Sequence, residues 1–288
     1  MSTKSILVTG CSAGGIGDAL ALALALQGHH VFATARNPAK VPETLSSLSK
    51  VTVLKLDVSS AESVTEAAKA VAESGQGLDV LVNNAGCGYA QPILDIDIAK
   101  AQRLFDTNLW GPIRMVQAFA DLLIASKGRV VNISSVGAIV NTPWIAAYAS
   151  SKAALNSMSD TLRLELSPFG VSVVTVMAGV VDSEFHANDP DFELPPSSRY
   201  APIKDAIASW ASGKAKPKGC SAQEFAEALV VDVIGSKRPA VYRGPRAGAV
   251  KFVTIWLPTW LVDFFMSQGQ GLKELSQKVA EDVSKGEN

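Results

Sequence analysis

Hydrophobic positions in the first 180 residues follow two alternating patterns. Short runs rich in β-branched residues predict buried strands, and longer stretches with apolar residues at helical spacing predict helices. The expected strands cover residues 5–9, 31–34, 51–56, 80–82, 129–133 and 172–176. The expected helices cover residues 17–27, 61–73, 107–125 and 146–166. Because strands that alternate with helices form parallel sheets covered on both faces, this pattern predicts an α/β fold with a doubly wound parallel sheet of about seven strands.

The pattern changes after residue 180. Residues 182–219 are rich in proline, serine, aspartate and lysine, and four aromatic residues lie among them. A long, weakly periodic insertion is typical of a lid or binding loop, and a poorly ordered surface loop is the alternative. A helix at 222–234 and a strand at 240–242 are expected next. We therefore predict one main domain over residues 1–245, with a lid at about 182–219, and a helical extension over 246–288.

Composition excludes several classes of function. The chain has 288 residues, 26 basic and 27 acidic, so no charge excess favours binding to nucleic acid. Its three cysteines are odd in number and widely spaced, which favours a reducing compartment such as the cytoplasm over a disulfide framework. Its three histidines lack metal-ligand spacing, and we expect no metal site. The strand pattern begins almost at the first residue, so we expect no signal peptide.

A glycine-rich loop, T-G-C-S-A-G-G-I-G at 9–17, follows the first expected strand and opens the first expected helix. Glycines in that position let the backbone approach a pyrophosphate, which then lies at the helix N-terminus. The loop therefore predicts a Rossmann-type sheet that binds a dinucleotide.

The end of the second strand indicates which dinucleotide is bound. An acidic residue about 20 positions past the loop would bind the ribose 2′-hydroxyl of NAD. Arg36 occupies that region instead, nineteen residues after Gly17, and residues 19–41 contain no acid. Because a guanidinium suits a 2′-phosphate, we predict NADP(H). A solvated arginine at a strand end is the alternative.

Candidate catalytic residues lie between positions 135 and 152. Tyr148 and Lys152 stand four residues apart, so on a helix their side chains share one face, and Ser135 lies thirteen residues before the tyrosine. A phenol beside an ammonium can serve as acid and base in carbonyl chemistry. An ammonium about 4 Å away could lower the phenol pKa by roughly 3 units. An ordinary helix with a packed tyrosine and a solvated lysine is the alternative.

Together these motifs resemble the short-chain dehydrogenase/reductase family, over roughly residues 4 to 245. Besides the glycine loop, the matching segments are L-D-V at 56–58, N-N-A-G at 83–86, F-D-T-N ending at Asn108, I-S-S at 133–135 and Y-A-S-S-K at 148–152. The resemblance implies that Tyr148 is the general acid, that Lys152 lowers its pKa, and that Ser135 binds the substrate carbonyl, with Ser134 a less favoured substitute. It also implies that Asn108 holds a water that relays protons to Lys152.

The resemblance implies a set of cofactor-binding residues as well. These are Gly10, Ser12, Gly15, Ile16, Gly17, Arg36, Asp57, Asn84, Gly86, Tyr148, Lys152, Val181 and Ser183. The glycine loop is one residue longer than the family pattern, so either Gly14 or Gly15 can be the inserted residue. The resemblance further implies a homodimer or homotetramer formed through the helices that carry Asn108 and Tyr148.

Within the family, the glycine loop, the strand end V-F-A-T-A-R-N and V-Y-R-G at 241–244 are most similar to a fungal subgroup that includes 1-acyldihydroxyacetone-phosphate reductase. This implies NADPH-dependent reduction of a ketone on an apolar or acyl-bearing substrate. The alternatives are a polyketide-type ketoreductase of secondary metabolism and a non-catalytic dinucleotide-binding scaffold. Lysines and an arginine in the lid could face a substrate phosphate; we expect most of them to be solvated.

Residues 252–262 are the most apolar segment of the chain. The segment is eleven residues long and contains Pro258, so it is too short and too broken to span a bilayer. With Trp256 and Trp260 it could lie on the surface of the endoplasmic reticulum or a lipid droplet. A wall over the substrate pocket and a subunit contact are the alternatives. We favour surface association, because the related reductases act on acyl lipids.

Overall fold

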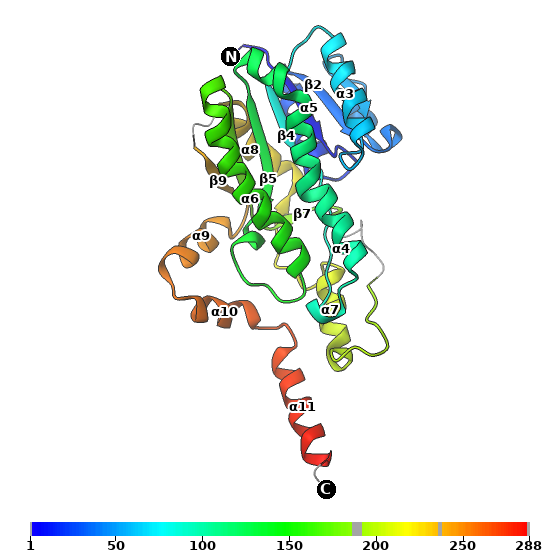
Figure 1. Ribbon diagram of the computed structural model, residues 1–288, viewed down its shortest axis with the longest axis vertical. Helices are drawn as coiled ribbons and strands as arrows, with labels where there is room; N and C mark the ends of the chain where they lie inside the picture. The colour runs from blue at the N-terminus through cyan, green and yellow to red at the C-terminus, as the bar shows by residue number, and fades with distance from the viewer. Residues whose placement is uncertain (1, 186–191, 236–237, 287–288) are drawn as a thin grey trace.

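The computed structural model describes residues 2–185, 192–235 and 238–286. A seven-stranded sheet lies at its centre, in the order β3-β2-β1-β4-β5-β6-β9, and every neighbouring pair is parallel (Figure 1). The strands are β1 (Ser5–Thr9), β2 (His30–Ala35), β3 (Val51–Lys55), β4 (Val80–Asn83), β5 (Arg129–Ser135), β6 (Ser172–Ala178) and β9 (Ala240–Arg243). The predicted doubly wound parallel sheet is therefore confirmed.

Helices cover both faces of the sheet and bury a separate core on each. Successive residues of β1 point to opposite faces, so Ile6 and Val8 enter one core and Leu7 the other. The first core packs against α1 (Ile16–Leu26), the short α2 (Glu43–Ser46) and α8 (Ala222–Gly235). The second packs against α3 (Ala61–Glu73), α5 (Gly111–Ser126) and the C-terminal half of α6 (Ala146–Leu166).

The predicted helices at 61–73 and 146–166 match α3 and α6. The prediction of one continuous helix at 107–125 is wrong. Its place is taken by α4 (Ile98–Phe105), a π-helical turn (Asp106–Trp110) and α5. Asp97 begins α4, where its carboxylate accepts a hydrogen bond from the backbone N–H of Lys100. The π turn precedes Pro112, which has no N–H to donate to a regular helical ladder. The turn places Asn108 in the protein interior.

The 182–219 segment is fixed at its base. There β7 (Val181–Asp182) pairs with β8 (Cys220–Ser221), and Lys216 forms an ion pair of 2.7 Å with Asp182. Within the segment, Ile203 and Ile207 of the stretch that ends in α7 (Lys204–Ala211) pack with Trp144, which lies just before α6. Residues 186–191 of the predicted lid lie outside the described residues.

Three helices form the C-terminal extension: α9 (Ala247–Trp256), α10 (Thr259–Ser267) and α11 (Leu272–Gly286). They lead away from the sheet, and α11 ends at the opposite end of the molecule from the N-terminus (Figure 1). Pro258 separates α9 from α10. Large apolar side chains on these two helices are exposed: Phe252, Ile255, Trp256, Trp260, Phe264 and Phe265. Among the helices described, none is both long enough and apolar enough to cross a membrane.

Candidate active site

The structure brings Ser135, Tyr148, Lys152 and Asn108 together at the carboxyl edge of the sheet. Ser135 is the last residue of β5, Tyr148 and Lys152 lie one turn apart on α6, and Asn108 comes from the π turn. Gly86, just after β4, lies beside Asn108 and Lys152. A Cβ atom on Gly86 would be 3.2 Å from Asn108 Oδ1 and 3.5 Å from Lys152 Nζ. The absence of a side chain there keeps space open beside both polar groups.

Lys152 is 5% exposed, and its ammonium donates a 2.8 Å hydrogen bond to the carbonyl of Ile133 on β5. Burial lowers the pKa of Lys152 to about 8, because the charged form loses hydration, while a nearby Cys87 thiolate would act in the opposite direction. The lysine therefore remains mostly protonated at neutral pH, yet titrates far closer to neutrality than an exposed lysine.

The pKa of the Tyr148 hydroxyl is raised, whereas the sequence predicted that it is lowered. Burial raises its pKa, and the hydrogen bond with Ser135 only partly offsets that rise. We expected the ammonium of Lys152 to lower the tyrosine pKa, but Lys152 is directed to the Ile133 carbonyl and burial is the larger effect. Tyr148 is consequently neutral near pH 7. It is in the form that a proton donor requires.

The two adjacent serines point in different directions. Ser134 is buried, and its hydroxyl donates to the backbone carbonyl of Lys152 at 3.4 Å. The Ser135 hydroxyl lies beside Tyr148 and accepts a 3.0 Å hydrogen bond from the N–H of Gly137. Ser135 is therefore the serine whose hydroxyl is placed to meet a carbonyl oxygen near Tyr148.

Asn108 is fully buried and braces the segment after β4. Its Nδ2 donates to the carbonyl of Cys87 at 2.9 Å and to the hydroxyl of Ser151 at 3.0 Å, and its Oδ1 accepts from the N–H of Cys87 at 2.9 Å. These bonds join the π turn, the segment after β4 and α6. The water relay implied by the resemblance stays a prediction.

The glycine loop turns tightly between β1 and α1. Gly10 and Gly14 adopt positive φ values of 76° and 73°, which glycine adopts without strain. Gly15 has an ordinary φ and precedes α1, and a Cβ on it would lie 3.1 Å from the carbonyl of Ser12. Glycine is thus favoured at position 14 by the backbone conformation, and at position 15 by a tight approach to the Ser12 carbonyl. Ile16 begins α1 and packs against the first core.

Gly17 and Asn84 hold the loop against β4. A Cβ on Gly17 would overlap the Asn84 amide and the Gly10 carbonyl. The same amide donates to the carbonyl of Thr9 at 2.8 Å and to that of Gly10 at 3.3 Å. Asn84 therefore fixes the conformation of the glycine loop through these two hydrogen bonds.

The two residues predicted to select and hold the nucleoside lie at the ends of neighbouring strands. Arg36 directly follows β2 and is exposed. Asp57 follows β3, where its carboxylate accepts hydrogen bonds from the N–H of Ser59 at 2.9 Å and from the Ser59 hydroxyl at 2.6 Å. Arg36 is therefore accessible to solvent, and Asp57 is held in place by its own turn.

Val181 and Ser183 lie at the start of the lid, across the sheet edge from the glycine loop. The carbonyl of Val181 accepts a 3.1 Å hydrogen bond from Lys216, and its side chain packs against the first core. Glu184 links this segment to the loop, since its N–H donates to the carbonyl of Gly14 at 3.4 Å.

Sequence reasoning missed three residues that touch the candidate catalytic group. Cys87 interacts with both Tyr148 and Lys152, Gly137 leaves room beside the tyrosine ring, and Phe185 packs on that ring. Cys87 directly follows N-N-A-G, so its place beside the site could have been found from the motif. Nothing in the local sequence around Phe185 indicates its contact.

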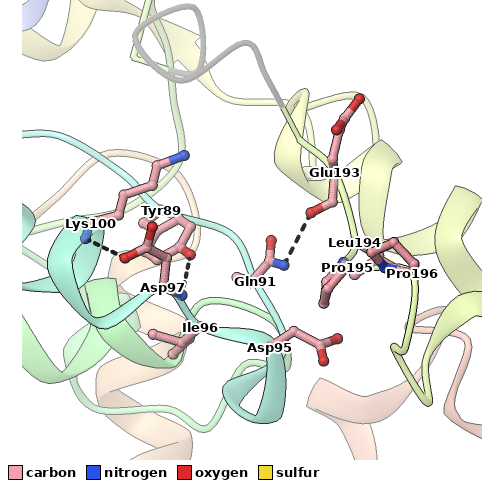
Figure 2. Close-up of a pocket in the computed structure, with 10 residues that line it drawn as sticks. All are labelled: Tyr89, Gln91, Asp95, Ile96, Asp97, Lys100, Glu193, Leu194, Pro195 and Pro196. Carbon is pink, nitrogen blue, oxygen red and sulfur yellow. Dashed lines mark hydrogen bonds between the residues drawn. The ribbon is translucent and has the colours of Figure 1, made fainter.

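A cavity of about 420 Å³ lies between the segment after β4 and the returning part of the lid, and the four candidate catalytic residues are not among those that line it. Figure 2 shows Tyr89, Gln91 and Asp95 on one side and Leu194 and Pro195 on the other. Tyr89 also packs in one apolar cluster with Tyr148. Three carboxylates and one ammonium line the cavity: Asp95, Asp97, Glu193 and Lys100. No group of potential metal ligands occurs in the part of the chain that the structure describes.

Comparisons with known proteins agree with this geometry. The sequence model of the family described as short chain dehydrogenase matches residues 4–193. Short-chain dehydrogenase ptmH from Penicillium ochrochloron is 41% identical over 273 residues, which cover 94% of this chain and all of the relative. The NADPH-dependent 1-acyldihydroxyacetone phosphate reductase from Schizosaccharomyces pombe is 38% identical over 242 residues, 82% of this chain and 80% of the relative.

Solved structures have the same fold. A short-chain dehydrogenase from Streptomyces avermitilis superposes with a TM-score of 0.74 at 26% identity, and covers all of this chain and 99% of its own. An alcohol dehydrogenase from Thermococcus sibiricus, complexed with 5-hydroxy-NADP, superposes with a TM-score of 0.68 at 26% identity, over 84% of this chain and 97% of its own. On these matches, together with the assembled motifs, the chain belongs to the short-chain dehydrogenase/reductase family and is an oxidoreductase of that family.

Proposed function

We propose that this protein is an NADPH-dependent reductase of a ketone on an apolar or acyl-bearing substrate. The observation that carries the proposal is the grouping of the four candidate catalytic residues at the carboxyl edge of the sheet, where Ser135 hydrogen-bonds Tyr148 and where Asn108 and Lys152 face the space at Gly86. A catalytic role for the four residues follows from that grouping and from the family. A non-catalytic scaffold has no need for the buried ammonium of Lys152, because its burial carries a desolvation cost.

The chemistry divides between cofactor and protein. When bound, the nicotinamide supplies a hydride to the carbonyl carbon. Tyr148 donates its proton to the carbonyl oxygen, and Ser135 donates a hydrogen bond that holds that oxygen. Lys152, one turn along α6 from Tyr148, can return a proton to the phenolate left on Tyr148, because the lysine pKa is near 8. The product is an alcohol, and one proton is consumed.

The preference for NADP(H) rests on Arg36. Its guanidinium is exposed after β2, where it could pair with a 2′-phosphate, while the glycine loop and the N-terminus of α1 suit the pyrophosphate. The relative from Schizosaccharomyces pombe is described as NADPH-dependent, and the similar structure from Thermococcus sibiricus is a complex with 5-hydroxy-NADP. Arg36→Asp should lower kcat/KM for NADPH at least tenfold and raise it for NADH. An unchanged ratio of the two values would remove the assignment.

Two substrate classes are supported, each by one observation. A relative that reduces acyldihydroxyacetone phosphate, 38% identical, favours an acyl phosphate. The cavity favours an unphosphorylated, polyketide-type ketone, because its charged lining is mostly acidic. Lys216, one of the lid cations that could have met a phosphate, is already paired with Asp182.

The discriminating experiment measures NADPH consumption with an acyldihydroxyacetone phosphate and with a panel of aromatic and alicyclic ketones. Turnover of the acyl phosphate alone would favour a role in glycerolipid synthesis. Turnover of the ring ketones alone would favour secondary metabolism. Failure to oxidise NADPH with any ketone, in protein that still binds NADPH, would support the scaffold alternative and remove the proposed function.

We also propose that α9 and α10 contact a lipid surface. Trp256 and Trp260 are about 70% exposed, and no charged residue lies between Lys251 and Asp263. Exposed aromatic residues in an uncharged segment suit the interface between lipid headgroups and acyl chains. The protein should float with phosphatidylcholine vesicles, and replacement of both tryptophans by serine should leave it in the soluble fraction. Equal flotation of the wild type and the variant would remove this proposal.

A homodimer or homotetramer formed through α5 and α6 is the expected assembly. Trp110, just before α5, and Leu164 on α6 are both more than half exposed, so apolar surface is available on that side of the molecule. Sedimentation equilibrium of the wild type and of Leu164→Glu tests this arrangement. The variant should dissociate toward monomer, and an unchanged mass would argue against this interface.

A further inference from the structure

The strongest unassigned feature is the aromatic contact on the catalytic tyrosine. The Phe185 ring meets the Tyr148 ring edge to face, with centroids 5.6 Å apart and planes at 65°. Phe185 comes from the segment after β6, so the contact joins the lid to α6 across the open edge of the sheet. On another side of the tyrosine ring lies Gly137, whose Cβ would be 3.8 Å from Tyr148 Cε1. Phe185 thus supplies an apolar wall against the Tyr148 ring.

Gly88 provides the space that Phe185 occupies. A Cβ on Gly88 would lie 2.8 Å from Phe185 Cε1 and 3.1 Å from its Cζ. Both distances are below van der Waals contact, so an alanine at this position would force the phenylalanine ring to move. The backbone of Gly88 is outside the left-handed region, and alanine would therefore be compatible with its conformation.

Residues 181–184, which directly precede Phe185, are held in place by several contacts. Asp182 and Val181 both bind Lys216, and the strand pairing of β7 with β8 lies three residues before Phe185. The N–H of Glu184 binds the glycine loop. These contacts fix the direction in which Phe185 leaves the sheet, so its ring position is set by the fold and by Gly88 together.

We propose that Phe185 is a specificity-determining residue, whose ring contacts the carbon skeleton next to the substrate carbonyl and favours ketones flanked by a flat ring. The proposal rests on the proposed function and deepens it toward a substrate class. A ketone whose oxygen reaches Tyr148 and Ser135 must place its substituents near the tyrosine ring, where the Phe185 ring makes an edge-to-face contact. Offset or edge-to-face contact with an aromatic or alicyclic ring is then available, and a straight chain gains less from it.

The test is a double-mutant cycle measured with two substrates, a tetralone as ring ketone and 2-octanone as straight-chain ketone. Phe185→Ala should lower kcat/KM for the tetralone about 10- to 30-fold and for 2-octanone less than about threefold. Gly88→Ala should reproduce the loss with the tetralone in the wild type and have little effect in the Phe185→Ala background, since both act through one ring. Phe185→Leu should restore part of the loss.

Matched controls exclude general damage. Phe169 is exposed on the outer surface, and a Cβ on Gly248 would meet no neighbour, so Phe169→Ala and Gly248→Ala should leave both kinetic constants unchanged. NADPH affinity, measured by fluorescence, should be the same in every variant, which shows that the fold is intact without relying on turnover.

Three results would overturn the proposal. The first is an equal loss with both substrates in Phe185→Ala, and the second is additive effects of Gly88→Ala and Phe185→Ala. The third is a wild type that reduces neither ketone while reducing an acyl phosphate, since the substrate class would then be wrong although the proposed reductase function would stand. A wild type inactive toward all three would remove both proposals.

Discussion

The ammonium of Lys152 shows how one residue's burial affects both stability and chemistry. Its pKa near 8 is below the ordinary value of 10.5, so between these values the unfolded state binds more protons than the folded state. The free energy of unfolding therefore rises with pH across that window. The four-residue spacing of Tyr148 and Lys152 correctly predicted a shared helix face. It could not predict the pKa of either group, because burial depends on β4, β5 and the lid, which are distant in sequence.

This linkage predicts a pH-dependent difference between the wild type and Lys152→Met. Between about pH 7 and pH 10.5 the wild type should gain roughly 3 kcal/mol of unfolding free energy relative to the variant, because its buried lysine becomes neutral. Urea unfolding at several pH values measures the difference. Lys69→Met, at a lysine that is 75% exposed, is the surface control measured alongside it. A flat difference for Lys152→Met would contradict the burial described here.

At the scale of elements, α6 is bound to the sheet by a buried chain of amides. Asn83 on β4 donates to Asn132 on β5 at 2.8 Å, and Asn132 donates to the hydroxyl of Ser159 on α6 at 2.8 Å. Lys152 and Ser134 add two more bonds between β5 and α6. These contacts hold the helix that carries the candidate acid in one register on the sheet.

Ser159→Ala should lower the free energy of unfolding by about 1–3 kcal/mol, since it leaves the buried Asn132 amide without its acceptor. Chemical denaturation measures the change. Ser157→Ala on the same helix is the matched control, because Ser157 is exposed and its loss should change stability by less than about 0.5 kcal/mol. If the two variants were equally stable, the amide chain would not anchor α6.

The elements that the sequence predicted well are those with local signals. The residues of α3 and α6 were predicted from periodicity, and the parallel strands from β-branched runs between turns. The π turn was missed, since it holds Asn108 against Cys87 and Ser151, which are distant in sequence. The start of α4 was also missed, although Asp97 gives a local signal for it. The candidate-site residues that lie in sequence motifs, such as Tyr148 and Lys152, were likewise predicted. The contacts of Phe185 and Gly88 were not, because they join segments nearly 100 residues apart.

At the scale of the whole molecule, Trp144 connects the main domain, the lid and the C-terminal extension. Its indole N–H donates to the carbonyl of Gln270 at 3.1 Å, its ring meets Tyr200 of the lid, and its own carbonyl accepts from the N–H of Gln91. Its φ of 72° is unusual for a non-glycine residue and is maintained by these contacts. Leu275 of α11 packs into the same cluster. We therefore infer that the extension supports the lid beside the candidate site.

Leu275→Asp should lower stability by about 2–4 kcal/mol and raise KM for the ketone, because a carboxylate would be placed against Ile203 and Ile207. Val279→Asp, on the same helix but 55% exposed, is the control and should change neither quantity. Thermal unfolding and steady-state kinetics give both values. Identical behaviour of the two variants would mean that the extension does not support the lid.

The central claim is that Tyr148 is the proton donor in NADPH-dependent ketone reduction. Its most direct test compares NADPH consumption by the wild type and by Tyr148→Phe with the best ketone of the panel, alongside NADPH affinity measured by fluorescence. Loss of the hydroxyl should lower kcat by about 10²-fold or more, while NADPH still binds within about threefold of the wild-type affinity. A Tyr148→Phe variant that reduces the ketone at a rate close to that of the wild type would contradict the account.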